Sequence, residues 1–120
     1  MTIYESAEDY LERILILSEQ MEFVRAIDIV NDMGFSKPSV SIAMKKLQMN
    51  SYIKIGEKGH IALTEEGEKI AKRIYDRHLV LTKILMDLGV PEEVAKTDAC
   101  KIEHDLSDES FAAIKRSVKK

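Results

Sequence analysis

Apolar residues recur at helical spacing near the start of the chain and predict a first helix over residues 5–22. Its buried stripe is expected to consist of Tyr10, Ile14, Leu17 and Met21. A shorter pattern predicts a second helix over residues 25–33, which Gly34 ends as a C-terminal cap. Both helices are short enough to belong to one small packed unit.

A third helix is expected to begin after Ser36, whose hydroxyl is a good N-cap. Pro38 falls in its first turn, where a missing N–H costs nothing. Its apolar positions are Val40, Met44 and Leu47. Two helices joined by a tight turn that contains glycine are typical of a helix-turn-helix.

After Asn50 the period changes from helical to alternating, over residues 52–55 and again over 60–63. Gly56 and Gly59 bracket the residues between them, so the pattern predicts a β-hairpin. A hairpin directly after a helix-turn-helix is the winged-helix arrangement.

Helical periods then resume until the end of the chain. Thr64 is expected to cap a helix over residues 65–88, Pro91 to open one that reaches about Leu106, and Ser107 to cap one over 108–118. The last two helices are too short to bury their own apolar faces. A second copy of the chain is the simplest partner, and a homodimer would read two half-sites of a palindromic operator in double-stranded DNA.

Composition and charge narrow the class further. Cys100 is the only cysteine, the N-terminus does not resemble a signal peptide, and apolar runs are far shorter than the roughly 20 residues that span a bilayer. We therefore expect a cytoplasmic protein with no membrane partner. Net charge is −3, yet residues 25–60 carry three acids and six bases, net +3, as a DNA-reading surface would. A solvated surface face explains the same asymmetry.

The residues expected to meet DNA lie at the entry of the third helix, along its length and in the hairpin turn. They are Ser36, Lys37, Pro38, Ser39, Ser41, Lys45, Lys46 and Lys58. Helix capping is the simpler explanation of Ser36, and solubility is the simpler explanation of the lysines.

Cys100, Glu103 and His104 are spaced to share one face of the fifth predicted helix. A thiolate, a carboxylate and an imidazole on one face form a partial divalent-metal site. A buried free cysteine beside a solvated Glu-His pair is the plain alternative. Asp9 and Glu12 share a face of the first helix; without a metal they would be partners of its dipole. His78 of the long helix is a further ligand candidate or an ordinary, partly buried histidine.

The whole chain resembles the diphtheria toxin repressor and manganese transport regulator family of metal-dependent transcriptional repressors. The resemblance rests on the motifs Glu8-Asp9-Tyr10-Leu11-Glu12, Ser36-Lys37-Pro38-Ser39-Val40-Ser41, Leu63-Thr64 through Gly67, Arg77-His78, and Asp98-Ala99-Cys100-Lys101-Ile102-Glu103-His104 followed by Leu106-Ser107. It implies that the metal ligands are Asp9, Glu12, His78, Cys100, Glu103 and His104. It also implies a dimer interface from about Tyr75 onward.

The resemblance predicts a mainly α fold, with a winged helix-turn-helix DNA-binding domain over residues 1–72 and a helical dimerisation and metal-binding domain over 73–120. Iron-responsive members carry methionine in place of Asp9 and a further SH3-like domain, which is not expected here. Manganese regulators usually hold glutamate in place of Cys100, so the ligand set combines features of both branches. Lys96 and Thr82 replace two ligands of the iron branch's ancillary site, and Ile42 replaces a polar residue of the toxin repressor's recognition helix.

We expect Mn²⁺ or Fe²⁺ as the activating ion, with a slight preference for Mn²⁺ because the layout around Asp9 resembles that of the manganese regulators. Carboxylates suit Mn²⁺, whereas a thiolate shifts preference toward Fe²⁺, Co²⁺ or Zn²⁺, so Zn²⁺ or Co²⁺ can substitute. With His78 joining two clusters, the set can hold one ion or two. The function expected is a metal-activated repressor of manganese or iron homeostasis, without enzymatic activity or a small-molecule substrate. A small metallohydrolase and a winged-helix module that binds DNA or protein without metal are the alternatives.

Overall fold

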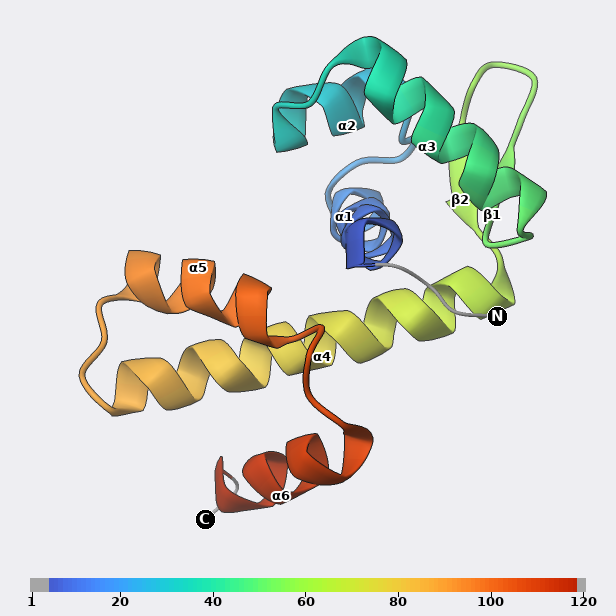
Figure 1. Ribbon diagram of the computed structural model, residues 1–120. Coiled ribbons are helices and arrows are strands. Elements are labelled where there is room, and N and C mark those ends of the chain that lie inside the picture. The colour runs from blue at the N-terminus through green and yellow to red at the C-terminus, as the bar shows by residue number, and fades with distance from the viewer. Residues whose placement is uncertain (1–4, 119–120) are drawn as a thin grey trace. The chain divides into compact units, whose positions relative to one another are not determined.

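The computed structural model describes residues 5–118, and over these residues the chain is helical apart from one two-stranded hairpin (Figure 1). The elements are α1 Glu5–Gln20, α2 Ala26–Met33, α3 Lys37–Met49, β1 Ile53–Ile55, β2 Ile61–Leu63, α4 Glu65–Asp87, α5 Glu92–Ile102 and α6 Asp108–Val118. The predicted order of helices and hairpin is confirmed. The chain divides into two compact units, one up to Lys72 and one from Arg73 onward, so α4 contributes to both.

The first unit is a winged helix-turn-helix. α1 packs against α2 and β2, while α3 packs against α2 and β1. Most of the apolar positions predicted from the sequence form its core, with Ile14, Ile29 and Val40 fully buried. The prediction for Met21 is wrong, because α1 ends at Gln20, just before it, and its side chain is 36% exposed. The helix-turn-helix geometry depends on Gly34, which ends α2 with φ 73°, a left-handed conformation that glycine adopts without steric cost. Ser36 caps α3 as predicted, because its Oγ accepts a hydrogen bond from Ser39 N at 3.2 Å.

The hairpin pairs β1 with β2 in antiparallel register, Ile53 opposite Leu63 and Ile55 opposite Ile61. Ile61 N also donates to Val24 O at 2.7 Å, which ties the wing to the segment between α1 and α2. Gly59 has a φ of 76° and closes the turn.

A second glycine joins the wing to α4. A side chain at Gly67 would collide with the carbonyl oxygen of Tyr52, so the first turn of α4 lies directly on the backbone that enters β1. Thr64 reinforces this junction: its Oγ1 donates to Ser51 O at 2.7 Å and accepts from Gly67 N at 3.1 Å. The predicted Thr64 cap is therefore confirmed.

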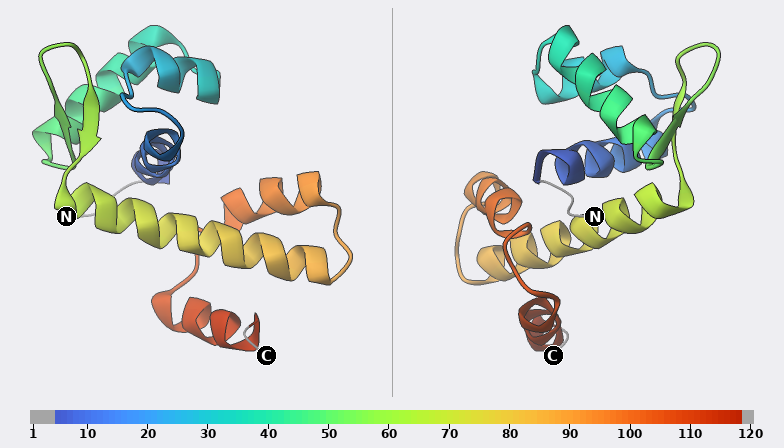
Figure 2. Two further views of the ribbon diagram at one scale, coloured as in Figure 1. Left: turned by 180° about the vertical axis from the view of Figure 1, so that it is seen from behind. Right: turned by 45° about the vertical axis from the view of Figure 1, so that its right-hand side comes forward.

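The second unit consists of the remainder of α4 with α5 and α6. Figure 2 shows α5 and α6 on opposite sides of α4. Ile74, Leu81, Ala95 and Ala99 are buried between these helices. No helix within residues 5–118 has both the length and the apolar character needed to cross a membrane.

One predicted boundary is wrong in a way that matters for the site. The fifth helix was expected to reach about Leu106, but α5 ends at Ile102, with Glu103 as its C-cap residue. The carbonyls of Glu103 and Leu106 accept hydrogen bonds from the Arg77 guanidinium of α4, at 3.1 and 2.6 Å. Because a side chain satisfies these carbonyls, the chain leaves the helical path and turns toward α6.

Candidate metal centre and nucleic-acid interface

Three potential metal ligands of the second unit meet between α4 and the end of α5. They are His78, Cys100 and Glu103, with one ligand atom from each lying within 4.8 Å of the other two. His78 Nδ1 lies 3.0 Å from Glu103 Oε2 and 3.7 Å from Cys100 Sγ. Two ligands that each lie about 2.0–2.3 Å from one ion are at most about 4.6 Å apart, so these two distances suit a shared cation.

Electrostatics at this cluster also favour a positive charge. Hydrogen bonds that the protonated ring donates from Nδ1, to Cys100 first and then to Glu103, raise the pKa of His78 from its ordinary value of 6.5 to about 10, against the opposing effect of burial. The protonated imidazole therefore supplies the cation that the thiol and carboxylate attract. A bound metal ion would take over this role by displacing the proton from Nδ1.

Glu103 connects this cluster to His104. Its side chain is fully buried, and among the described residues Oε1 has no hydrogen-bond partner, although it lies 3.5 Å from His104 Nε2. A buried carboxylate oxygen without a hydrogen bond is costly unless a cation compensates it. The sulfur, nitrogen and oxygen donors present here fit a borderline divalent ion such as Fe²⁺, Co²⁺ or Zn²⁺, and the carboxylate also suits Mn²⁺.

The prediction that Cys100, Glu103 and His104 share one helical face is only partly correct. Cys100 and Glu103 do meet, because the C-cap residue Glu103 keeps right-handed helical dihedrals (φ −57°, ψ −24°) and its N–H still bonds to Ala99 O. His104 lies beyond the end of α5, so its position is set by the turn and not by helical spacing. Of these three candidate ligands, Cys100 is therefore on α5, Glu103 is at its C-cap, and His104 is in the turn that follows.

Arg77 supports this turn, and the sequence analysis did not assign it a role. Its side chain is only 2% exposed, and its guanidinium also binds Asp108 Oδ1 at 2.6 Å and lies 5.2 Å from the ring centre of Phe111. Arg73 first, and then Arg77, lower the pKa of Asp108 through hydrogen bonds and charge attraction. The sequence does indicate that Arg77 is unusual, because it is a charged residue within the otherwise apolar stripe between Ile74 and Leu81.

Asp9 and Glu12 are on α1 in the first unit, three residues apart and therefore on the same face of the helix. Glu12 is buried, at 4% exposure, and Asp9 is partly buried. Burial is unusual for carboxylates, and it distinguishes this pair from simple partners of the helix dipole at the surface.

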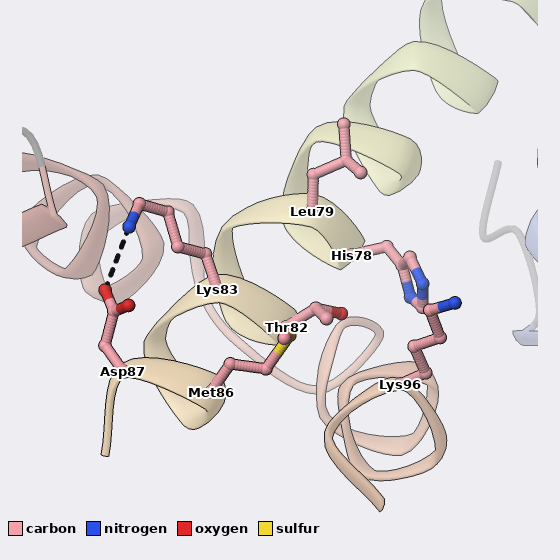
Figure 3. Close-up of a pocket in the computed structure, with 7 residues that line it drawn as sticks. All are labelled: His78, Leu79, Thr82, Lys83, Met86, Asp87 and Lys96. Atoms are coloured by element: carbon pink, nitrogen blue, oxygen red, sulfur yellow. Dashed lines mark hydrogen bonds and ion pairs between the residues drawn. The ribbon is translucent and has the colours of Figure 1, made fainter. Parts of the chain in front are cut away.

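A pocket of about 370 Å³ opens beside His78 on the second unit (Figure 3). Thr82 and Lys96, the residues that replace two ligands of the iron branch's ancillary site, both line it. Lys83 and Asp87 pair with each other across its rim at 3.0 Å. An ammonium group and a hydroxyl are poor substitutes for an imidazole and a carboxylate, so this lining does not suit a second cation.

The predicted DNA-contacting residues all lie in the first unit, in and before α3 and in the hairpin turn. All eight are exposed: Ser36, Lys37, Pro38, Ser39, Ser41, Lys45, Lys46 and Lys58. Ser36 donates from its hydroxyl to Ser39 Oγ at 2.8 Å, in addition to capping the helix. Ser41, Lys45 and Lys46 lie on the outward side of α3, opposite its buried stripe.

An exposed helix-turn-helix with a wing, joined to a helical unit that carries a thiol, imidazole and carboxylate cluster, defines the class of metal-dependent DNA-binding transcription regulators. Residues 2–61 match the N-terminal DNA-binding domain of iron-dependent repressors. Residues 64–120 match the metal-binding and dimerisation domain of the same repressors. The chain therefore belongs to the iron-dependent repressor family, whose members regulate transcription and are not enzymes.

Curated relatives agree with this assignment. The transcriptional regulator MntR of Escherichia coli O157:H7 is 33% identical over 116 residues, which cover 97% of this chain and 75% of that protein. An uncharacterized HTH-type transcriptional regulator of Methanocaldococcus jannaschii is 35% identical over 118 residues, covering 97% of this chain and 94% of that protein.

Solved structures share the fold. The manganese regulator SloR superposes with a TM-score of 0.85 at 28% identity, over 99% of this chain and 55% of that one. A manganese-dependent transcriptional repressor in complex with manganese gives 0.86 at 26% identity, over 94% of this chain and 52% of that one. The chain thus spans about half the length of these two solved regulators.

Proposed function

We propose that the protein is a metal-activated repressor of manganese or iron homeostasis, and that binding of Mn²⁺ or Fe²⁺ orders a homodimer for a palindromic operator. The observation that carries the proposal is the cluster of His78, Cys100 and Glu103, whose ligand atoms lie within 4.8 Å of one another. The buried Oε1 of Glu103, for which the described residues offer no hydrogen-bond partner, adds to the attraction of this cluster for a cation.

The proposed ligand set is Asp9, Glu12, His78, Cys100, Glu103 and His104. Asp9 and Glu12 enter through the family resemblance and through their burial on α1. Order gained on metal binding lowers the later cost of ordering on DNA, which is a coupling free energy between the two sites.

Mn²⁺ is the ion we favour. Asp9 supplies a hard carboxylate where the iron branch has methionine, and two solved proteins described as manganese regulators match 94–99% of this chain. Cys100 is the opposing feature, because a thiolate suits Fe²⁺, Zn²⁺ or Co²⁺ better than Mn²⁺. A Cys100→Glu variant should therefore strengthen the preference for Mn²⁺ over Zn²⁺, measured by competition for the site at fixed pH.

The proposal is tested by fluorescence anisotropy with a duplex selected from a random DNA library. Affinity is measured in chelator and then with Mn²⁺, with Fe²⁺ under anaerobic conditions, and with Zn²⁺, all at one salt concentration because phosphate contacts depend on salt. We expect one ion to raise affinity at least about tenfold, which is roughly 1.4 kcal/mol of coupling. Equal affinity in chelator would instead support a metal-independent winged-helix module.

Two variants localise the effect. Glu103→Gln keeps the size of the side chain but removes its charge, and we expect it to abolish the metal-dependent gain in affinity. Glu93→Gln makes the same change at an exposed position of α5 and should behave as wild type. A sedimentation measurement on both variants shows whether the dimer persists, so that loss of metal response is not confused with loss of assembly.

A further inference from the structure

Ile42 is an exposed apolar residue at the centre of the DNA-facing side of α3. Its side chain is 57% exposed, whereas Val40 and Met44 on the same helix are buried at 0% and 3%. At 3.6 residues per turn, Ile42 lies roughly 200° around the helix axis from Val40, so it points away from the core. More than half of this β-branched apolar side chain therefore stays in contact with water when the first unit folds.

The surroundings of Ile42 are polar and basic. Ser39 and Ser41 precede it, and Lys45 and Lys46 follow on the next turn, all of them exposed. Lysines at these positions suit the phosphates on either side of a groove, which positions a helix without selecting a sequence. Ile42 has no hydrogen-bond donor or acceptor, so any contribution to base selection has to come through apolar contact.

The major groove offers one apolar group on its base edges, the C5-methyl of thymine. Recognition helices contact base edges mainly through their N-terminal residues, and Ile42 lies in the first half of α3. Resting on the proposed DNA-binding function, we infer that Ile42 is a specificity-determining residue that packs on a thymine methyl in each half-site of the operator. This contact selects thymine through its methyl group and not through a hydrogen bond.

The test removes the methyl group from the DNA and the side chain from the protein. The protein with Mn²⁺ selects a duplex from a random library, and each thymine of that duplex is then replaced by deoxyuridine in both half-sites. We expect one thymine position whose replacement weakens binding about fourfold per half-site, or about 15-fold for both, the cost of exposing one methyl-sized apolar group in each. All other replacements should have smaller effects.

Ile42→Ala should lose the same affinity and become insensitive to deoxyuridine at that position, while keeping its sensitivity elsewhere. Met49→Ala is the matched control: Met49 is 83% exposed on the same outward side of α3 but at its C-terminal end, and its removal should leave the pattern unchanged. Circular dichroism verifies that each variant keeps the wild-type helical content, which is expected because alanine favours helix at an exposed position.

Three outcomes overturn the inference. The first is that no thymine position loses affinity when its methyl group is removed. The second is that Ile42→Ala keeps the wild-type pattern of sensitivity to deoxyuridine, and the third is that Met49→Ala removes this pattern as well. Selection of a duplex together with any of these results leaves the proposed repressor function intact and refutes the role of Ile42 alone. Failure to select any duplex with Mn²⁺, Fe²⁺ or Zn²⁺ refutes the proposed function and the inference together.

Discussion

Replacing Arg77 by alanine should destabilise the second unit far more than replacing its neighbour Arg73. The Arg77 side chain is 2% exposed and donates to the carbonyls of Glu103 and Leu106, at 3.1 and 2.6 Å. Arg73 is 47% exposed, and it also binds Asp108 Oδ1, at 3.0 Å. The two variants remove the same charge from positions one helical turn apart on α4.

The magnitude follows from the two carbonyl contacts, of which the one to Glu103 is buried and the one to Leu106 is partly buried. Hydrogen bonds from a charged donor contribute about 1.5–3 kcal/mol each, and truncation leaves both carbonyls without their donor. We expect Arg77→Ala to lower the free energy of unfolding by about 3–5 kcal/mol, in the range for breaking a buried charged pair. Arg73→Ala should cost much less, because exposed ion pairs contribute little. Arg77→Lys should fall between them, since an ammonium lacks the planar fork that reaches several acceptors.

The assay is urea unfolding followed by circular dichroism, in chelator, at pH 7 and fixed salt. Mn²⁺ affinity is measured by calorimetry on whichever variants remain folded. Arg77→Lys should bind Mn²⁺ more weakly than Arg73→Ala does, because the turn held by Arg77 carries Glu103 and His104. Equal stability losses in Arg77→Ala and Arg73→Ala would refute the reasoning that the guanidinium holds the turn in place.

Three further predictions concern the pH response, the wing junction and the helix cap. In chelator, charged His78 should stabilise the second unit fully below pH 6.5, and this stabilisation should be lost as the pH rises to about 10, because the pKa of His78 is raised in the folded state. Urea unfolding of wild type and His78→Gln should therefore show a larger difference in the free energy of unfolding at pH 6 than at pH 10. Gly67→Ala should cost about 1–3 kcal/mol through collision with the Tyr52 carbonyl, whereas Gly56→Ala, whose added Cβ would lie 3.8 Å from the nearest atom, should melt close to wild type. Ser36→Ala should cost about 1 kcal/mol in the same denaturation assay, and no loss would mean that the observed cap contributes nothing.

The sequence by itself determined the order of the elements and the family. Helix caps, glycine turns and apolar periods act over a few residues, so Gly34, Ser36, Thr64 and Ser107 could be assigned without knowledge of the fold, and the structure shows each in its expected role. The motifs that carry the family resemblance are also contiguous in the chain. Local physics and local motifs were therefore sufficient for the winged helix-turn-helix and its helical extension.

Only the tertiary structure decided how the candidate metal centre is assembled. His78 and Cys100 are 22 residues apart in the chain, and they meet because α5 packs against α4. Helical periodicity extended α5 too far, since it contains no information about the guanidinium of Arg77, which comes from another helix and satisfies the carbonyls of Glu103 and Leu106. The end of α5 is thus set by a buried contact over 26 residues of sequence, and contacts of that range depend on how the helices pack.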